Sequence, residues 1–162
     1  MSRISISRVD HVSLTVRDAD AAATFYQEAF GARERYRVGP IASGQLPRSG
    51  AKDWTDAHLG VPGATLTIVM LDLTDDLGLE LFQYDAPDHP NTSPLPPNAV
   101  GANHIGLVVQ DLEAAAQALV THGCHLADAT IDLPEGPTSD RLFRYLTDPF
   151  GNILELVQQR TA

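Results

Sequence analysis

At 162 residues, the chain has the length of one compact domain or of two small fused modules. With 43% hydrophobic and 20% charged residues, it has the composition of an ordinary soluble globular protein. A net charge of −10 with no basic run argues against a nucleic-acid partner, because a phosphate backbone attracts clustered lysine and arginine.

Further features of the sequence indicate where in the cell the protein resides. The single cysteine, Cys124, cannot form a disulfide within the chain, which favours a reducing compartment. Residues 1–9 alternate polar and apolar side chains instead of forming the apolar core of a signal peptide. No apolar run approaches the roughly 18 to 20 residues that span a bilayer. We therefore expect a cytoplasmic protein without a membrane partner.

The first elements are a strand and a helix. Residues 8–16 alternate with period two, which predicts a strand with His11 on the face opposite its aliphatic side chains. Asp18 or Asp20 can cap a helix that runs through Phe30, and Gly31 suits its left-handed end.

Further strands are expected in this half. A first strand covers residues 33–38 and ends at loop residues 39–40, and a short one covers residues 54–59. Residues 64–71 form the clearest strand. After a turn, residues 78–84 form another, in which Glu80, Phe82 and Tyr84 share one face.

A proline-rich connector separates the halves. Residues 86–101 contain five prolines, which fit an extended segment and not a sheet or helix. It divides the chain into a first module (1–85) and a second module (102–162). The second module repeats the order of elements: strand, helix, then strands, at residues 102–109, 111–121, 124–129, 141–147 and 153–158.

Two histidines and two glutamates recur at matched positions of the halves. Each histidine (His11, His104) heads a strand and is followed seven residues later by an aspartate. Each glutamate lies in a late strand, in Leu79-Glu80-Leu81-Phe82-Gln83 and in Leu154-Glu155-Leu156-Val157-Gln158. Two imidazoles and two carboxylates are suitable ligands for a divalent ion that keeps positions open for water or substrate. The repeat therefore predicts a metal site.

These motifs resemble the vicinal oxygen chelate superfamily, which includes glyoxalase I, epimerases, extradiol dioxygenases and the fosfomycin and bleomycin resistance proteins. Besides the histidines and glutamates, the turn Asp148-Pro149-Phe150-Gly151-Asn152 carries the resemblance. The resemblance implies an α+β fold of two tandem βαβββ modules, whose curved mixed sheets form a cup around the metal. It further implies that the metal ligands are His11, Glu80, His104 and Glu155. The ion itself is left open among zinc, nickel, cobalt, manganese and iron.

Four intact ligands make the chain most similar to glyoxalase I or to an epimerase. The resemblance implies a lyase, isomerase or epimerase that moves a proton next to a carbonyl through a metal-stabilised enediolate. Glu155 and Glu80 are the candidate bases, and Glu155 is favoured by the resemblance alone. The substrate is then a small molecule with neighbouring oxygens. Two alternatives stay open: an iron(II) dioxygenase, and a binding protein that sequesters a drug without turnover.

Side chains outside the ligand set give weaker signals. Arg48, His58, Arg144 and Tyr145 are candidate substrate contacts, although each is also a common surface or packing residue. Small curved sheets leave edge strands that need pairing, so we expect a homodimer.

Overall fold

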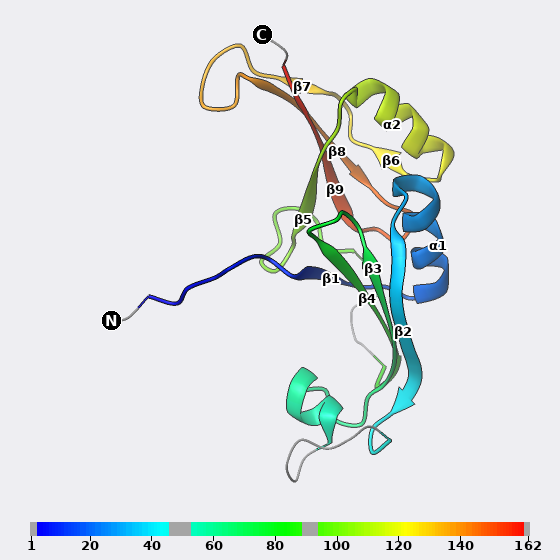
Figure 1. The fold of residues 1–162 in the computed structure, drawn as a ribbon. Coiled ribbons are helices and arrows are strands. Elements are labelled where there is room, and N and C mark those ends of the chain that lie inside the picture. The colour runs from blue at the N-terminus through cyan, green and yellow to red at the C-terminus, as the bar shows by residue number, and fades with distance from the viewer. Residues whose placement is uncertain (1–2, 46–52, 89–93, 161–162) are drawn as a thin grey trace. The chain divides into compact units, whose positions relative to one another are not determined.

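The computed structural model describes residues 3–45, 53–88 and 94–160 (Figure 1). The candidate substrate contact Arg48 lies outside these ranges. The chain divides into two compact units, residues 1–91 and 92–162. No helix among the described residues is long and apolar enough to cross a membrane.

The first unit is a four-stranded mixed sheet with one long helix. Its strands lie in the order β1-β4-β3-β2, with β1 parallel to β4 and the other neighbours antiparallel. The elements are β1 (His11–Thr15), α1 (Ala19–Phe30), β2 (Arg33–Ala42), η1 (Thr55–Leu59), β3 (Thr65–Asp72) and β4 (Gly78–Ala86). Helix α1 packs along one face of this sheet, against β3 and β4 (Figure 1).

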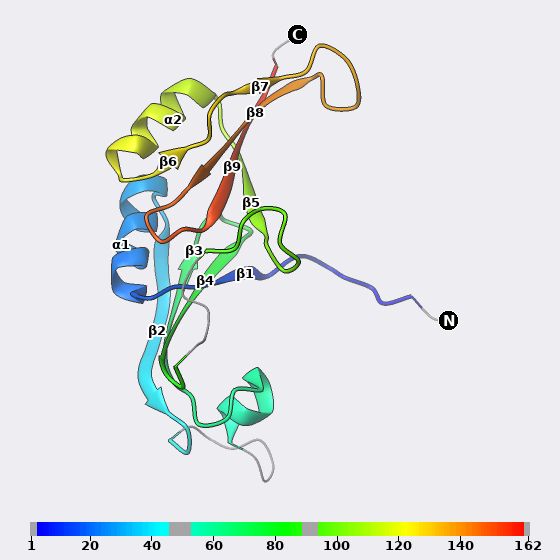
Figure 2. The same ribbon diagram turned by 180° about the vertical axis from the view of Figure 1, so that it is seen from behind.

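The second unit repeats this plan. Strands β5, β9, β8 and β6 are neighbours in that order, β7 also pairs with β8, and β5 is parallel to β9. The elements are β5 (His104–Val108), α2 (Leu112–Thr121), β6 (His125–Leu126), β7 (Ile131–Asp132), β8 (Arg141–Thr147) and β9 (Ile153–Gln159). Helix α2 packs on one face of its sheet, as the view from behind shows (Figure 2). The prediction of an α+β fold with two βαβββ-like modules is confirmed.

The helices begin where the aspartates predicted them. Asp18 accepts a hydrogen bond from the Ala21 amide at 2.8 Å, and Asp111 accepts one from the Ala114 amide at 2.9 Å. Each bond satisfies an amide that has no partner within the helix. Helix α1 ends at Gly31, which adopts the left-handed conformation as predicted.

Side chains along the last strand of each unit point alternately to the two faces of the sheet. We call the face covered by the helix the helix face, and the opposite one the open face. Leu79 and Leu81 are fully buried beneath α1. Leu154 and Leu156 are buried in the same way beneath α2. The glutamate between each leucine pair therefore points to the opposite, open face. A residue three positions after the glutamate returns to the helix face.

That position holds a glutamine in both units. The Gln83 side-chain oxygen accepts a hydrogen bond from the first amide of α1, at Ala19, over 2.9 Å. Gln158 does the same for the first amide of α2, at Leu112, over 2.7 Å. The recurring Leu-Glu-Leu-x-Gln sequence thus joins the last strand of each unit to the start of its helix.

Three sequence predictions were wrong in detail. Strand β2 continues through Gly39-Pro40 to Ala42, because a register shift between Val38 and Ile41 accommodates the two residues. The segment predicted as a strand at residues 54–59 is a π-helical turn, whose Trp54 and Leu59 pack on a buried cluster that includes Phe82. Strand β6 is only two residues long, and the unpredicted β7 follows it.

Boundaries differ elsewhere by a few residues. Residues 8–10 lie outside β1, and β4 and β9 run slightly beyond their predicted ends, whereas β8 begins and ends as predicted. Cys124 is buried, and this burial raises the pKa of its thiol to about 11. It is a packing residue.

The glutamine contact gives a stability prediction. Gln158→Ala removes a partly buried acceptor and leaves the Leu112 amide without it, so we expect a loss of about 1 kcal/mol in unfolding free energy. For a chain of this length, that loss lowers the melting temperature by roughly 2 to 4 °C. Gln159→Ala, at the exposed neighbouring position, is the matched control and should melt like the wild type. Equal melting temperatures for both variants would contradict the capping role.

Candidate metal centre

The parallel strand pair of each unit brings one histidine next to one glutamate. In the first unit His11 lies opposite Gly78, and Glu80 follows two residues later on the same face. In the second unit His104 lies opposite Ile153, and Glu155 again follows two residues later. We call each of these pairs, His11 with Glu80 and His104 with Glu155, a half-site. The two half-sites have the same strand register.

The distances within the two half-sites also match. His11 Nε2 lies 3.4 Å from a Glu80 carboxylate oxygen, and His104 Nε2 lies 3.6 Å from a Glu155 oxygen. Both histidine side chains are about 40% exposed, at 39% and 43%, whereas the glutamates are more buried, at 15% and 22%. In each half-site the imidazole is open to a small ligand, and the carboxylate lies deeper in the sheet.

The Nδ1 atom of His11 contacts the carboxylate of Asp10. His11 Nδ1 lies 3.1 Å from an Asp10 oxygen. The hydrogen bond to His11 and the nearby Arg8 guanidinium lower the pKa of the Asp10 carboxyl, so Asp10 is an ionised acceptor at neutral pH. Since an ionised carboxylate can only accept, the neutral imidazole donates from Nδ1 and presents a lone pair at Nε2.

His104 has a different partner. Its Nδ1 lies 3.4 Å from the Tyr145 hydroxyl, and the two rings are tilted with centroids 5.1 Å apart. A hydroxyl can donate or accept, so Tyr145 constrains His104 less strictly than Asp10 constrains His11. The residue before His104 is Asn103, which explains why the two half-sites differ here.

This donor set fits a divalent cation. In the neutral His11 ring, the Nε2 lone pair and the Glu80 carboxylate are two acceptors facing each other, an arrangement that a cation between them would stabilise. Separations of 3.4 and 3.6 Å are those of two ligands that each lie ~2.1 Å from one ion at a roughly tetrahedral angle. In metal sites, a ligand histidine commonly donates its other ring N–H to a carboxylate, as His11 does to Asp10.

The predicted four-ligand set is present as two pairs. Within the described ranges, no three or more His, Cys, Asp or Glu side chains form a single group able to hold a metal. The assignment of all four residues to one ion stays a prediction.

Two tyrosines lie near Glu80. Tyr36 is opposite Met70 on β3, which is itself opposite Glu80, so the three side chains share one row on the open face. Burial raises the pKa of Tyr36 and Tyr84, and the negative charge of Glu80 raises both further. Both hydroxyls therefore stay protonated at neutral pH and can donate hydrogen bonds to a ligand oxygen. Sequence reasoning placed Tyr84 on this face but missed Tyr36.

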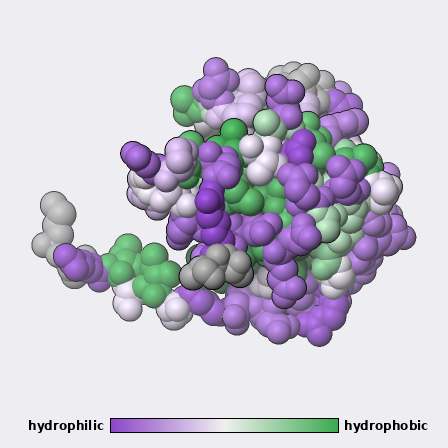
Figure 3. Space-filling view, turned by 90° about the horizontal axis from the view of Figure 1, so that it is seen from above, coloured by the Kyte–Doolittle hydropathy of each residue, from purple (hydrophilic) through white to green (hydrophobic). Residues whose placement is uncertain are grey.

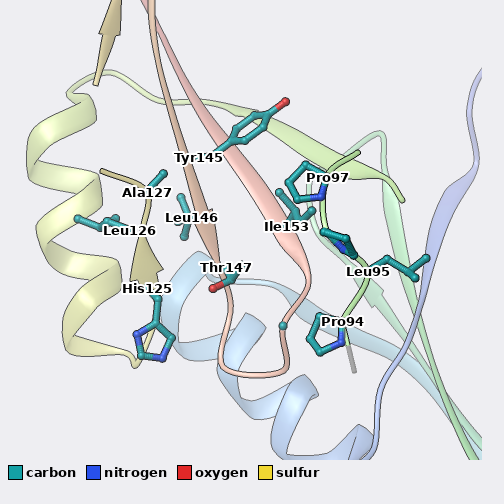
Figure 4. Close-up of a pocket in the computed structure, with 12 residues that line it drawn as sticks. Pro94, Leu95, Pro97, His125, Leu126, Ala127, Tyr145, Leu146, Thr147 and Ile153 are labelled. Carbon is teal, nitrogen blue, oxygen red and sulfur yellow. The ribbon is translucent and has the colours of Figure 1, made fainter. Parts of the chain in front are cut away.

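A cavity of about 440 Å³ lies in the second unit (Figure 4). Connector residues Pro94, Leu95 and Pro97 lie on one side of it and the β6 side chains on the other (Figure 4). Tyr145, which contacts His104, and Ile153, its register partner, also line the cavity. Its volume is within the usual range for small-molecule sites, and its lining is mainly apolar.

The remaining candidate contacts have structural surroundings. Arg144 donates to the Ala127 carbonyl and pairs with Glu113 on α2, so it joins the helix to the sheet. His58 stacks on Trp54 in the π-helical turn. Of the four weaker candidates, Tyr145 alone is shown in contact with a predicted ligand within the described part of the chain.

Similarity to known proteins identifies the family of the chain. The family model described as the glyoxalase, bleomycin resistance protein and dioxygenase superfamily matches residues 8–156. The chain belongs to this superfamily. The resemblance noted from the sequence motifs is thereby confirmed.

Individual members of the superfamily extend this result. A 2-epi-5-epi-valiolone epimerase from an Actinomyces species is 35% identical over 152 residues, covering 92% of this chain and 78% of that protein. A glyoxalase family protein from Bacillus cereus has a TM-score of 0.76 at 21% identity, with 99% of each chain covered. The fosfomycin resistance protein FosX from Listeria monocytogenes, in complex with Mn(II) and sulfate, has a TM-score of 0.53 at 16% identity, over 96% of this chain and 95% of that one. The two structures establish the likeness of fold alone.

The half-site geometry predicts the tautomer of His11. In the metal-free protein, at a pH where the ring is neutral, the proton should reside mainly on Nδ1, because Asp10 accepts it. Long-range ¹H–¹⁵N correlation spectra of the imidazole report this directly. Asp10→Ala should shift His11 toward the mixture of tautomers found in exposed histidines, while His58 stays unchanged. A predominant Nε2–H form in the wild type would contradict the geometry.

Proposed function

We propose that the protein is a divalent-metal-dependent epimerase that moves a proton at a carbon next to a ketone. The observation that carries this proposal is the pair of matched half-sites, in which an imidazole and a carboxylate oxygen are 3.4 to 3.6 Å apart. The 35% identical relative is an epimerase, which supports this reaction class over the others in the superfamily.

We propose that His11, Glu80, His104 and Glu155 together hold the ion. When bound, a divalent ion would supply Lewis-acid stabilisation for negative charge that develops on the substrate carbonyl oxygen. The set also matches the ions considered above, since imidazole and carboxylate ligands suit zinc, nickel, cobalt, manganese and iron.

The protein's own side chains would then handle the proton. A carbonyl acidifies the C–H bonds beside it, and an epimerase must remove such a proton and return one to the opposite side of the carbon. We assign the removal to Glu155 and the return to Glu80, because one carboxylate from each half could act on the two sides. The hydroxyls of Tyr36 and Tyr84 would donate to the substrate near Glu80.

The relative's name suggests the substrate class. The ending of valiolone denotes a ketone, so we propose a cyclic ketone of the valiolone type as the first compound to test. Tyr145, which contacts His104, lines the cavity of the second unit, and the mainly apolar lining offers contact to the carbon skeleton of such a ring. A dioxygenase or a non-catalytic binding protein would need no second carboxylate at the matched position.

Proton exchange tests this assignment. We expect the wild-type protein, loaded with Mn²⁺ or Zn²⁺, to exchange the hydrogen beside the carbonyl of 2-epi-5-epi-valiolone with deuterium from solvent, as followed by NMR. Glu155→Gln keeps the size and an oxygen donor but cannot accept a proton at neutral pH. The exchange rate should therefore fall roughly a hundredfold or more, the usual scale of a general base.

The control for this experiment is Glu113→Gln, a change of the same type on the outer surface of helix α2. It should exchange at the wild-type rate. If Glu155→Gln also exchanged at that rate, the base would have to be Glu80 or a water molecule. Oxygen consumption with Fe²⁺, in place of exchange, would favour the dioxygenase.

A further inference from the structure

The two half-sites differ in where the histidine carries its ring proton. At His11, the Asp10 carboxylate lies 3.1 Å from Nδ1, which is closer than the 3.4 Å between Nε2 and the Glu80 carboxylate. The neutral ring therefore carries its proton on Nδ1 and keeps the lone pair of Nε2 free. The first half-site thus already has the tautomer that binding an ion through Nε2 requires.

His104 has the opposite surroundings. Its Nε2 lies 3.6 Å from the Glu155 carboxylate, whereas its Nδ1 lies 3.4 Å from the Tyr145 hydroxyl. A proton on Nε2 faces the negative charge of Glu155, and the lone pair of Nδ1 can then accept a hydrogen bond from the Tyr145 O–H. In the metal-free protein we therefore expect His104 to carry its proton on Nε2.

Binding an ion through Nε2 requires the other tautomer of His104. The nitrogen that binds an ion uses its lone pair, so the ring proton has to lie on Nδ1. Nδ1 then donates to the Tyr145 oxygen, from which it accepted before. The ring has one proton in both states, because water takes the proton from Nε2 and supplies the one on Nδ1.

The Tyr145 hydroxyl reverses its role at the same time. A hydroxyl has one hydrogen to donate, and its lone pairs accept. Once Tyr145 accepts from His104, its own hydrogen has to point away from that ring. Because Tyr145 lines the cavity of the second unit (Figure 4), this hydrogen becomes available to a ligand in the cavity.

We propose that Tyr145 couples the occupancy of the metal centre to ligand binding in the cavity of the second unit. The ligand class is a molecule with an acceptor oxygen, such as a ketone, which binds more tightly once His104 has changed tautomer. By reciprocity, the same ligand raises the affinity for the ion by the same factor. The proposal rests on the proposed role of His104 as a metal ligand.

Long-range ¹H–¹⁵N correlation spectra of the metal-free and the Zn²⁺-loaded protein test the change of tautomer. We expect His104 to change from Nε2–H to Nδ1–H on loading, whereas His11 keeps its proton on Nδ1. Hydrophilic side chains cover much of the surface seen from above (Figure 3), and the exposed His122 is an internal reference that should not change. A His104 that already carries its proton on Nδ1 without metal would overturn the proposal.

A thermodynamic cycle tests the role of the hydroxyl, with cyclohexanone as the probe. Its dissociation constant is measured by NMR titration for the wild type and Tyr145→Phe, each with and without Zn²⁺. We expect Tyr145→Phe to weaken binding about threefold to tenfold in the Zn²⁺-loaded protein, the scale of one hydrogen bond, and to have little effect without Zn²⁺. Methylenecyclohexane, which has a similar shape but no acceptor oxygen, should bind the wild type and the variant equally.

Tyr84→Phe is the matched control, because it removes a hydroxyl from a ring that stacks on Phe82 and not on a histidine. Whatever its effect on cyclohexanone binding, that effect should be the same with and without Zn²⁺. Circular dichroism should show both variants folded, since each loses a single oxygen atom.

The outcomes separate this proposal from the proposed metal centre. If Zn²⁺ changes the spectra of neither His11 nor His104, the metal centre is wrong and the coupling is overturned with it. If Zn²⁺ changes His104 as expected, but Tyr145→Phe weakens cyclohexanone binding equally in both metal states or in neither, the coupling alone is overturned.

Discussion

The parallel pairing of the first and last strands within each unit is the constraint on which the candidate centre depends. It sets His11 opposite Gly78 and His104 opposite Ile153, and in both units the glutamate follows two residues later. A parallel pair cannot be closed by a tight turn, so the chain between the strands must cross over, and here it supplies the helix and the inner strands. A shift of one residue in this pairing would move the glutamate to the helix face, where the leucines are buried.

Much of the fold could be predicted because its signals are local and occur twice. Asp18, Gly31 and Asp111 act where they stand in the chain, so both helices were predicted closely. The failures depend on contacts between distant segments. The turn at residues 54–59 is shaped by packing on Phe82, and β2 passes through Gly39-Pro40 because it lies at a sheet edge that tolerates a bulge.

The candidate centre could be predicted only in part, for a similar reason. Repetition identified the two histidines and two glutamates, and the structure brings each histidine to its own glutamate. Repetition could not identify features that the halves do not share. Asp10 contacts the Nδ1 atom of His11, whereas the Tyr145 hydroxyl contacts that of His104. A carboxylate partner raises the basicity of an imidazole as a metal ligand more than a hydroxyl partner does. The two half-sites are thus alike in geometry and different in their outer partners.

We propose that both half-sites serve one ion. The most direct test measures the metal content of protein dialysed against Zn²⁺, by mass spectrometry, for the wild type, His11→Ala and His104→Ala. The account predicts about one ion per chain in the wild type and the loss of most of it in either variant, because each half supplies half of the ligands. His58→Ala, which changes an exposed histidine outside the half-sites, should retain the wild-type content. Full occupancy in both His11→Ala and His104→Ala would contradict the account.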